Sequence, residues 1–195
     1  GTGTPYEPNG FIARYSETGT IEWSTYWGDR TTIEGMAISA RRLIVVGGTR
    51  VPLPTPTTPL PAPATYLPPN LGPSADGDGY AAMFSTLDEE IWLCYLGGTE
   101  GDDAYDVRSL GKSFYVYAQT QSNDFTIVPM VGAYNDATFD SAAMSPPDAY
   151  LMQFDVDAQL IWSTYFGGKD AEQPGLNGLA LSPLNGDVYI VGTVV

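Results

Sequence analysis

Histidine is absent from this 195-residue chain, and cysteine occurs once, at Cys94. Without histidine the chain can form neither a Ser-His-Asp nor a Cys-His catalytic system, nor a metal site with imidazole ligands. A single cysteine also excludes an internal disulfide bond. Cys94 stands where two related phrases have Thr25 and Thr164. We therefore interpret it as a small buried residue, and we predict no catalytic residue.

Positive charge is scarce too, with 8 Lys and Arg residues against 23 Asp and Glu residues and a net charge of −15. A surface this acidic repels phosphate groups, so we predict that nucleic acid is not a partner. The sequence has no run of about 20 apolar residues, and we expect no membrane insertion. Hydrophobic residues nevertheless make up 43% of the chain, which is enough for a sizeable core.

One seven-residue phrase occurs three times. It reads WSTYWGD from Trp23, WLCYLGG from Trp92 and WSTYFGG from Trp162. The first two tryptophans are 69 residues apart and the last two are 70 apart, so the spacing is regular. This regularity predicts a repeat protein, in which each unit buries its apolar faces against its neighbours.

Each unit contains four short segments rich in aromatic and β-branched residues, a pattern typical of β-strands. Apolar residues lie on both faces of these strands, so each antiparallel sheet must be packed between two others. Radial stacking around a channel, as in a β-propeller, meets that requirement. We predict an all-β, propeller-type repeat of three four-stranded antiparallel blades. The predicted segments are blade 1 at 1–49, a proline-rich insertion at 50–77, blade 2 at 78–120, an insertion at 121–147 and blade 3 at 148–195.

Three blades are fewer than the four to eight that surround the channel of a typical propeller. We therefore expect the remaining blades to come from the same longer chain or from a partner. The repeated phrase supplies the residues that we expect to hold the sheets together, since one tryptophan can bury up to ~250 Å². These structural positions are Trp23, Trp92, Trp162, Tyr26, Tyr95, Tyr165, Gly28, Gly97 and Gly167.

The units resemble the bacterial SBBP repeat, a family named for its seven-bladed β-propeller. The third unit carries most of the resemblance, in Asp148-Ala149-Tyr150, the phrase from Trp162, Gly178-Leu179-Ala180-Leu181 and Val188-Tyr189-Ile190-Val191-Gly192. The segment from Asp124 to Tyr134 is similar to the sequence that joins units in that family. The resemblance implies a propeller from a secreted or surface-displayed protein. It transfers no catalytic motif, because the family is defined by packing residues.

Two further features have more than one interpretation. The segment from Val51 to Ala75 is rich in proline, which favours polyproline II. It is either a solvated surface excursion or a segment that docks a partner or carries O-glycans. The acidic loops at Asp76, Asp78, Asp102 and Asp103 offer the oxygen ligands that Ca²⁺ prefers, although the EF-hand order is absent. The alternative is solvated turns, and we predict no cofactor other than this possible calcium.

These features favour a non-catalytic extracellular or cell-surface module that binds or scaffolds a protein or glycan partner. One alternative is a polysaccharide-active enzyme, a glycosidase or lyase that uses carboxylates near the propeller channel. Acidic residues from different blades that converge in one pocket with raised pKa values would favour the enzyme. Another alternative is a secreted cargo recognised by surface-export machinery, because an incomplete ring presents an exposed edge.

Overall fold

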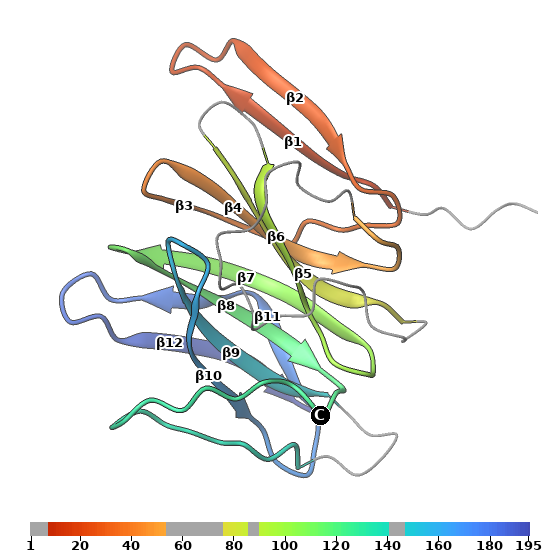
Figure 1. Ribbon diagram of the computed structural model, residues 1–195, viewed down its shortest axis with the longest axis vertical. Coiled ribbons are helices and arrows are strands. Elements are labelled where there is room, and N and C mark those ends of the chain that lie inside the picture. The colour runs from red at the N-terminus through yellow and green to blue at the C-terminus, as the bar shows by residue number, and fades with distance from the viewer. Residues whose placement is uncertain (1–7, 54–75, 86–89, 141–146) are drawn as a thin grey trace, which may run out of the picture.

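The computed structural model describes residues 8–53, 76–85, 90–140 and 147–195, so most of the proline-rich insertion lies outside the described residues. Within these ranges the protein consists of antiparallel strands, which confirms the predicted all-β class (Figure 1). The strands are β1 (Gly10–Tyr15), β2 (Ile21–Trp27), β3 (Gly35–Ser39), β4 (Arg42–Thr49), β5 (Asp78–Phe84), β6 (Glu90–Leu96), β7 (Asp102–Leu110), β8 (Ser113–Thr120), β9 (Asp148–Asp155), β10 (Leu160–Phe166), β11 (Glu172–Leu181) and β12 (Val188–Val194).

The described strands form two four-stranded sheets, in the orders β3-β4-β5-β6 and β7-β8-β9-β10, and two two-stranded sheets, β1-β2 and β11-β12. We expected the four strands of one unit to form one sheet. Instead, the sheets are offset from the sequence units by two strands. The last two strands of a unit pair with the first two strands of the next, with Val45 opposite Ala82 and Val116 opposite Met152.

Strand β5 explains this offset. All seven of its residues are buried, so β5 needs a hydrogen-bonded neighbour on each edge and a packed layer on each face. Strand β4 lies on one edge and β6 on the other, which makes β5 a central strand. Had the sheets followed the sequence units, β5 would begin a sheet and leave one buried edge without backbone partners, which is costly.

The four sheets stack face to face, with β1 and β2 at one end and β11 and β12 at the other (Figure 1). Buried side chains fill the space between successive sheets. In the middle layer, the Trp92 ring lies with its centroid 6.3 Å from that of Phe114 and 6.1 Å from that of Phe154, in edge-on contacts. Phe114 and Phe154 stack on each other at 5.0 Å. These rings join β6 to β8 and β9 across the two complete sheets.

The two complete sheets are closest at their first strands. Strand β7 contacts β3 and β4 in the preceding sheet and β11 in the following sheet. Towards the last strands, a connecting segment fills the gap. Phe125 lies against Tyr150 with ring centroids 4.2 Å apart, and Phe139 lies against Tyr165 at 6.0 Å. The spacing between sheets therefore widens from their first strands to their last.

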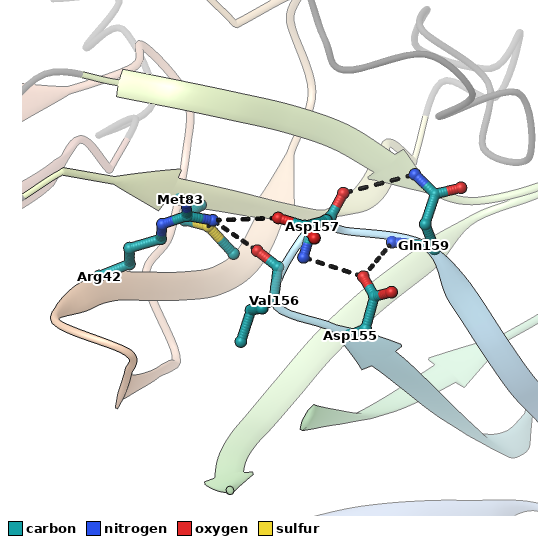
Figure 2. Close-up of polar contacts among 6 residues, drawn as sticks. All are labelled: Arg42, Met83, Asp155, Val156, Asp157 and Gln159. Atoms are coloured by element: carbon teal, nitrogen blue, oxygen red, sulfur yellow. Dashed lines mark hydrogen bonds and ion pairs between the residues drawn. The ribbon is translucent and has the colours of Figure 1, made fainter. Parts of the chain in front are cut away.

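A polar contact closes the same interface at the turn between β9 and β10 (Figure 2). The guanidinium of Arg42, at the start of β4, donates a hydrogen bond of 2.6 Å to the carbonyl of Val156. The carboxylate of Asp155 accepts hydrogen bonds of 2.9 Å from the backbone N–H groups of Asp157 and Gln159, which fixes the turn that presents this carbonyl. The guanidinium also lies 3.8 Å from the exposed carboxylate of Asp157.

We predict that Trp92→Ala lowers the free energy of unfolding by about 3–5 kcal/mol, because it leaves a cavity between two packed sheets. Urea denaturation followed by circular dichroism measures the change. Val131→Ala is the matched control, since Val131 is fully exposed and its truncation should change stability by less than about 0.5 kcal/mol. Equal effects of the two substitutions would contradict the packing described for the middle layer.

We also predict that Arg42→Ala lowers the free energy of unfolding by about 1–2 kcal/mol, because it removes a charge-assisted hydrogen bond to Val156. Asp157→Ala removes only an exposed ion pair and should change stability by less than about 0.5 kcal/mol. The same denaturation experiment compares the two variants. A larger loss from Asp157→Ala than from Arg42→Ala would show that the ion pair, and not the hydrogen bond to the turn, joins the sheets.

Candidate functional site

The repeated tryptophans and tyrosines lie at the interfaces between sheets. Trp92 and Trp162 are 2% and 9% exposed, and Tyr95 and Tyr165 are 3% and 1% exposed. Their equivalents in the first unit differ, since Trp23 is half-buried and Tyr26 is 82% exposed. Tyr26 lies on the outer face of the β1-β2 sheet, against which no described sheet is packed.

The repeated glycines end the phrase where the chain turns away from the sheet. Gly28 has φ of +72°, which a larger side chain rarely adopts. At Gly97 and Gly167 there is no room for a side chain. An added Cβ would lie 2.6 Å from the carboxyl carbon of Asp78 at Gly97 and of Asp148 at Gly167. The second and third units therefore use glycine to admit a buried aspartate from the neighbouring strand.

The tyrosine hydroxyls perform a role that the sequence analysis missed. The N–H of Leu53 donates to the Tyr95 hydroxyl at 2.8 Å, and the N–H of Phe125 donates to the Tyr165 hydroxyl at 3.2 Å. The Tyr165 hydroxyl donates in turn to the Ser122 carbonyl at 3.0 Å. Each tyrosine thus fastens the connecting segment that follows the fourth strand of a unit. The signal in the sequence is that Tyr, and never Phe, occupies this position in all three phrases.

The four candidate calcium ligands do not share one environment. Asp76 is exposed, whereas Asp78 and Asp102 are 1% and 7% exposed. Asp103 is partly buried. In the described part of the chain, no three His, Cys, Asp or Glu side chains form a group suited to holding a metal ion. Calcium binding stays a prediction that no observation here tests.

Asp102 lies in a corner made by protein hydrogen-bond donors. Its carboxylate accepts hydrogen bonds from the N–H of Gly98 at 2.8 Å, the hydroxyl of Ser122 at 2.9 Å and the N–H of Gln121 at 3.3 Å. The third unit has an equivalent of the contact between Gly98 and Asp102, because the N–H of Gly168 donates a hydrogen bond of 3.1 Å to the Glu172 carboxylate. An acidic residue four positions after the second glycine is the sequence signal for it.

Burial dominates the acid–base properties of this corner. Loss of hydration raises the pKa of Asp102 to about 7, against the opposing effect of its hydrogen-bond donors, and the nearby Asp78 carboxylate adds to the rise. Burial likewise raises the pKa of the Cys94 thiol, which is 4% exposed. A thiol in that state is a poor nucleophile, in keeping with the interpretation of Cys94 as a packing residue.

Asp103 is the acidic group that most resembles a catalytic one. Burial, followed by the negative charge of Glu34, raises the pKa of Asp103 to about 6, and Arg50 opposes the rise. Its buried Oδ1 atom has no hydrogen-bond partner among the described residues. Asp103 lies in β7, and Glu34 directly precedes β3 of the other complete sheet. Two carboxyls from separate units therefore lie within electrostatic reach of each other. Asp102 and Asp103 are adjacent on β7, and their side chains point to opposite faces.

A third acidic residue, Asp106, joins two sheets. It is 1% exposed, and its carboxylate accepts hydrogen bonds of 3.1 Å from the guanidinium of Arg108 and the N–H of Leu179. The Arg108 guanidinium also donates to the Leu179 carbonyl at 2.9 Å. This pair therefore holds β7 against β11, and both side chains act in packing.

An apolar groove of about 660 Å³ lies where β1 faces β3 and β4. Its lining includes aromatic and aliphatic side chains with two arginines, and the acidic residues described above are not part of it. The lining residues from β1, β3 and the turn between β3 and β4 include Phe11, Arg14, Tyr15, Met36, Ile38 and Arg41. Its size falls within the range of sites that hold a ligand or a peptide segment.

Comparison with protein-family models and with curated proteins gives no match for this chain. The resemblance to the SBBP repeat therefore rests on the motifs in the sequence. Among the described residues, no helix has the length and apolar character needed to cross a membrane.

We predict that Asp102→Asn flattens the pH dependence of stability. The pKa of an unfolded aspartate is about 3.9, so between about pH 4 and pH 7 the folded state binds more protons than the unfolded state at this site. The stabilisation from Asp102 is thus full below about pH 4 and is lost as the pH rises to about 7. The asparagine variant cannot titrate, and its free energy of unfolding should fall less over this interval.

Urea denaturation at several pH values between about 4 and 8 measures this dependence. Asp157→Asn is the control, because the Asp157 side chain is 68% exposed, and it should keep the wild-type slope. Identical slopes for wild type and Asp102→Asn would contradict the account of Asp102 as a carboxyl whose pKa is raised by burial in the folded state.

Proposed function

We propose that this chain forms part of a β-propeller that serves as a non-catalytic binding or scaffolding module, with a protein or a glycan as its partner. The proposed location is the outside or the surface of a bacterial cell, which follows from the SBBP resemblance and fits the net charge of −15. The observation that carries the proposal is the packing of successive sheets through equivalent residues of the repeated units.

The geometry of the stack supports radial packing over a flat pile of sheets. Strand β7 contacts β3 on one side and β11 on the other, so the first strands of three successive sheets lie together. Phe125 and Phe139 fill the wider gap near the last strands. Sheets that are close at one edge and spread at the other fan around an axis, as the blades of a propeller do.

The roles of the repeated residues support a module without catalysis. The tryptophans of the phrase and the tyrosines of its second and third occurrences, Tyr95 and Tyr165, pack between sheets. The hydroxyls of these two tyrosines fasten the connecting segments. Asp102 and Asp106 accept hydrogen bonds from groups of the fold itself. A rigid scaffold of this kind would present its turns and connecting segments to a partner.

One observation favours the alternative of a polysaccharide-active enzyme. Asp103 has a pKa raised to about 6 and lies near Glu34, which directly precedes β3 of the other complete sheet. A carboxyl with a raised pKa is suited to act as a general acid. Glycoside hydrolysis needs such an acid together with a second carboxylate. The apolar groove does not include either residue in its lining, so the non-catalytic proposal stands first.

We predict that the protein releases neither reducing ends nor unsaturated sugars from a panel of neutral and acidic polysaccharides. A reducing-sugar assay detects hydrolysis, and absorbance of the unsaturated product detects a lyase. Asp103→Asn is measured in parallel, with Asp157→Asn as the control for an exposed acid. Turnover by the wild type that falls at least a hundredfold in Asp103→Asn alone would replace the proposed function with the enzymatic one.

A further inference from the structure

The middle unit carries a charged pair where the units on either side carry small residues. Strands β3, β7 and β11 hold the same place in the three units, and each pairs with the strand that follows it. These pairings align the three strands through the equivalent pairs Met36–Val45, Val107–Val116 and Leu179–Ile190. One position earlier the units have Gly35, Asp106 and Gly178, and one position later they have Ala37, Arg108 and Ala180.

Two joints connect these strands, the first between β3 and β7 and the second between β7 and β11. In the first joint, glycine lets two backbones touch. A Cβ atom added to Gly35 would lie 3.0 Å from the Cα of Asp106 and 3.1 Å from the N–H nitrogen of Val107. Both of these atoms belong to the backbone, so they have little freedom to move aside. The first joint therefore has no space for a longer side chain at position 35.

In the second joint, a carboxyl group lies between the two backbones. Asp106 is 1% exposed, and its Oδ2 atom accepts a hydrogen bond of 3.1 Å from the N–H of Leu179. Leu179 is the equivalent of Val107. The backbone N–H that faces the Cβ position of Gly35 in the first joint therefore faces a carboxylate oxygen in the second. Because Oδ2 lies two bonds beyond Cβ, β11 cannot take the position against Asp106 that β7 takes against Gly35.

Arg108 completes the contact in the second joint. Its guanidinium donates hydrogen bonds of 2.9 Å to the carbonyl of Leu179 and 3.1 Å to the carboxylate of Asp106. It also lies 3.5 Å from the side-chain oxygen of Asn177. Asp106 and Arg108 together thus bind both backbone groups of Leu179, which buried backbone groups require. A neighbouring strand would bind the same two groups in a regular sheet.

Strand β11 has a bulge at the same place. The residues from Gly175 to Gly178 lie between the paired residues Pro174 and Leu179, where β12 has only Val191. Within the bulge Asn177 has φ of +55°, a left-handed conformation that is uncommon outside glycine. At the equivalent place β7 has one extra residue, and β3 has none in its pairing with β4. The long bulge thus occurs in the third unit, next to the charged pair of the middle unit.

We propose that the Asp106–Arg108 pair and the bulge of β11 form a matched lock that specifies which unit packs after the middle unit. The pair accepts a first strand that the bulge sets back from β7, and it binds the backbone of Leu179 in that strand. It rejects a strand without the bulge, because a backbone placed as β7 is placed against Gly35 would collide with the Asp106 carboxyl. The lock depends on the packing of the described sheets and goes beyond the proposed function.

A chain of similar units needs a device of this kind. Units that share their packing residues can stack on the wrong neighbour, and such misassembly is characteristic of repeat proteins. A buried ion pair adds little net stability, but it penalises every arrangement that leaves its members without partners. Asp106 and Arg108 would impose that penalty on any wrong neighbour. Gly35 and Ala37 place no comparable polar demand on the strand that packs against them.

A double-mutant cycle measures the match between the pair and the bulge. One change is Asp106→Gly with Arg108→Ala, which gives the middle unit the residues of its neighbours. The other is deletion of Leu176 and Asn177, which leaves β11 with one extra residue, as in β7. Each change alone should raise the unfolding equilibrium constant at least about tenfold, because it leaves the other half of the lock without its partner.

The combined variant is the decisive measurement. Urea denaturation should show it to be at least about tenfold more stable than the product of the two separate effects predicts. If the deletion alone prevents folding, the combined variant should recover the cooperative transition. The control combines the deletion with Arg42→Ala, which alters a contact between the two complete sheets and not the second joint. Those two effects should be independent of each other.

Amide hydrogen exchange tests the geometry of the lock without the deletion. The N–H of Leu179 donates to the Asp106 carboxylate, so its protection should fall at least about tenfold in Asp106→Gly with Arg108→Ala. The amide protons of the central strand β5 are the internal reference, because β5 keeps both of its strand neighbours. Their protection should change much less than that of Leu179.

Independent effects of the pair and the bulge overturn the proposal, as does a combined variant that folds no better than the deletion alone. Unchanged protection of Leu179 overturns it as well, because the pair would then not hold β11. None of these results decides the proposed function, which the polysaccharide assay tests separately with the unaltered protein.

Discussion

Strands that are apolar on both faces impose the main constraint on this protein. Strand β5 has no exposed residue, and the complete sheets bury side chains on each side. Such a sheet is stable only between two further layers, since apolar area left in water costs about 25 cal/mol per Å². Packing of sheet on sheet is therefore what makes each unit stable, and no unit provides that cover alone.

The same constraint accounts for features that otherwise look unrelated. The tyrosine hydroxyls fasten the connecting segments because buried backbone groups at the sheet rim need partners. Asp102 is surrounded by donors for the same reason, and its burial raises its pKa to about 7. At the two ends of the stack no described sheet covers the outer strands, and Phe11 and Val191 are exposed there. The apolar groove lies beside β1 at one of these ends.

The sequence was sufficient to predict the strands and the all-β class, because aromatic and β-branched residues recur at regular spacing. It was not sufficient to predict which strands share a sheet. Both the β2-to-β3 and the β4-to-β5 connections permit pairing or a change of sheet, and the repeat period is the same in either case. The complete burial of β5 decides between them, and burial depends on contacts between units that the spacing does not specify.

The candidate site was predictable to a smaller extent. The sequence analysis offered the acidic loops as calcium ligands, yet Asp76 is exposed while Asp78 and Asp102 are buried. The structural corner at Asp102 has a sequence signal, an acidic residue four positions after a glycine pair, that is visible only when the second and third units are compared. The exposure of Tyr26 had no signal, because its phrase matches those of Tyr95 and Tyr165.

Nuclear Overhauser effects between backbone protons test the central claim most directly, because they identify the strands that share a sheet. The account predicts cross-strand signals between β4 and β5, at Val45 and Ala82, and between β8 and β9, at Val116 and Met152. It predicts none between β2 and β3. Signals that join β2 to β3, with none across β4 and β5, would place each unit in its own sheet and contradict the account.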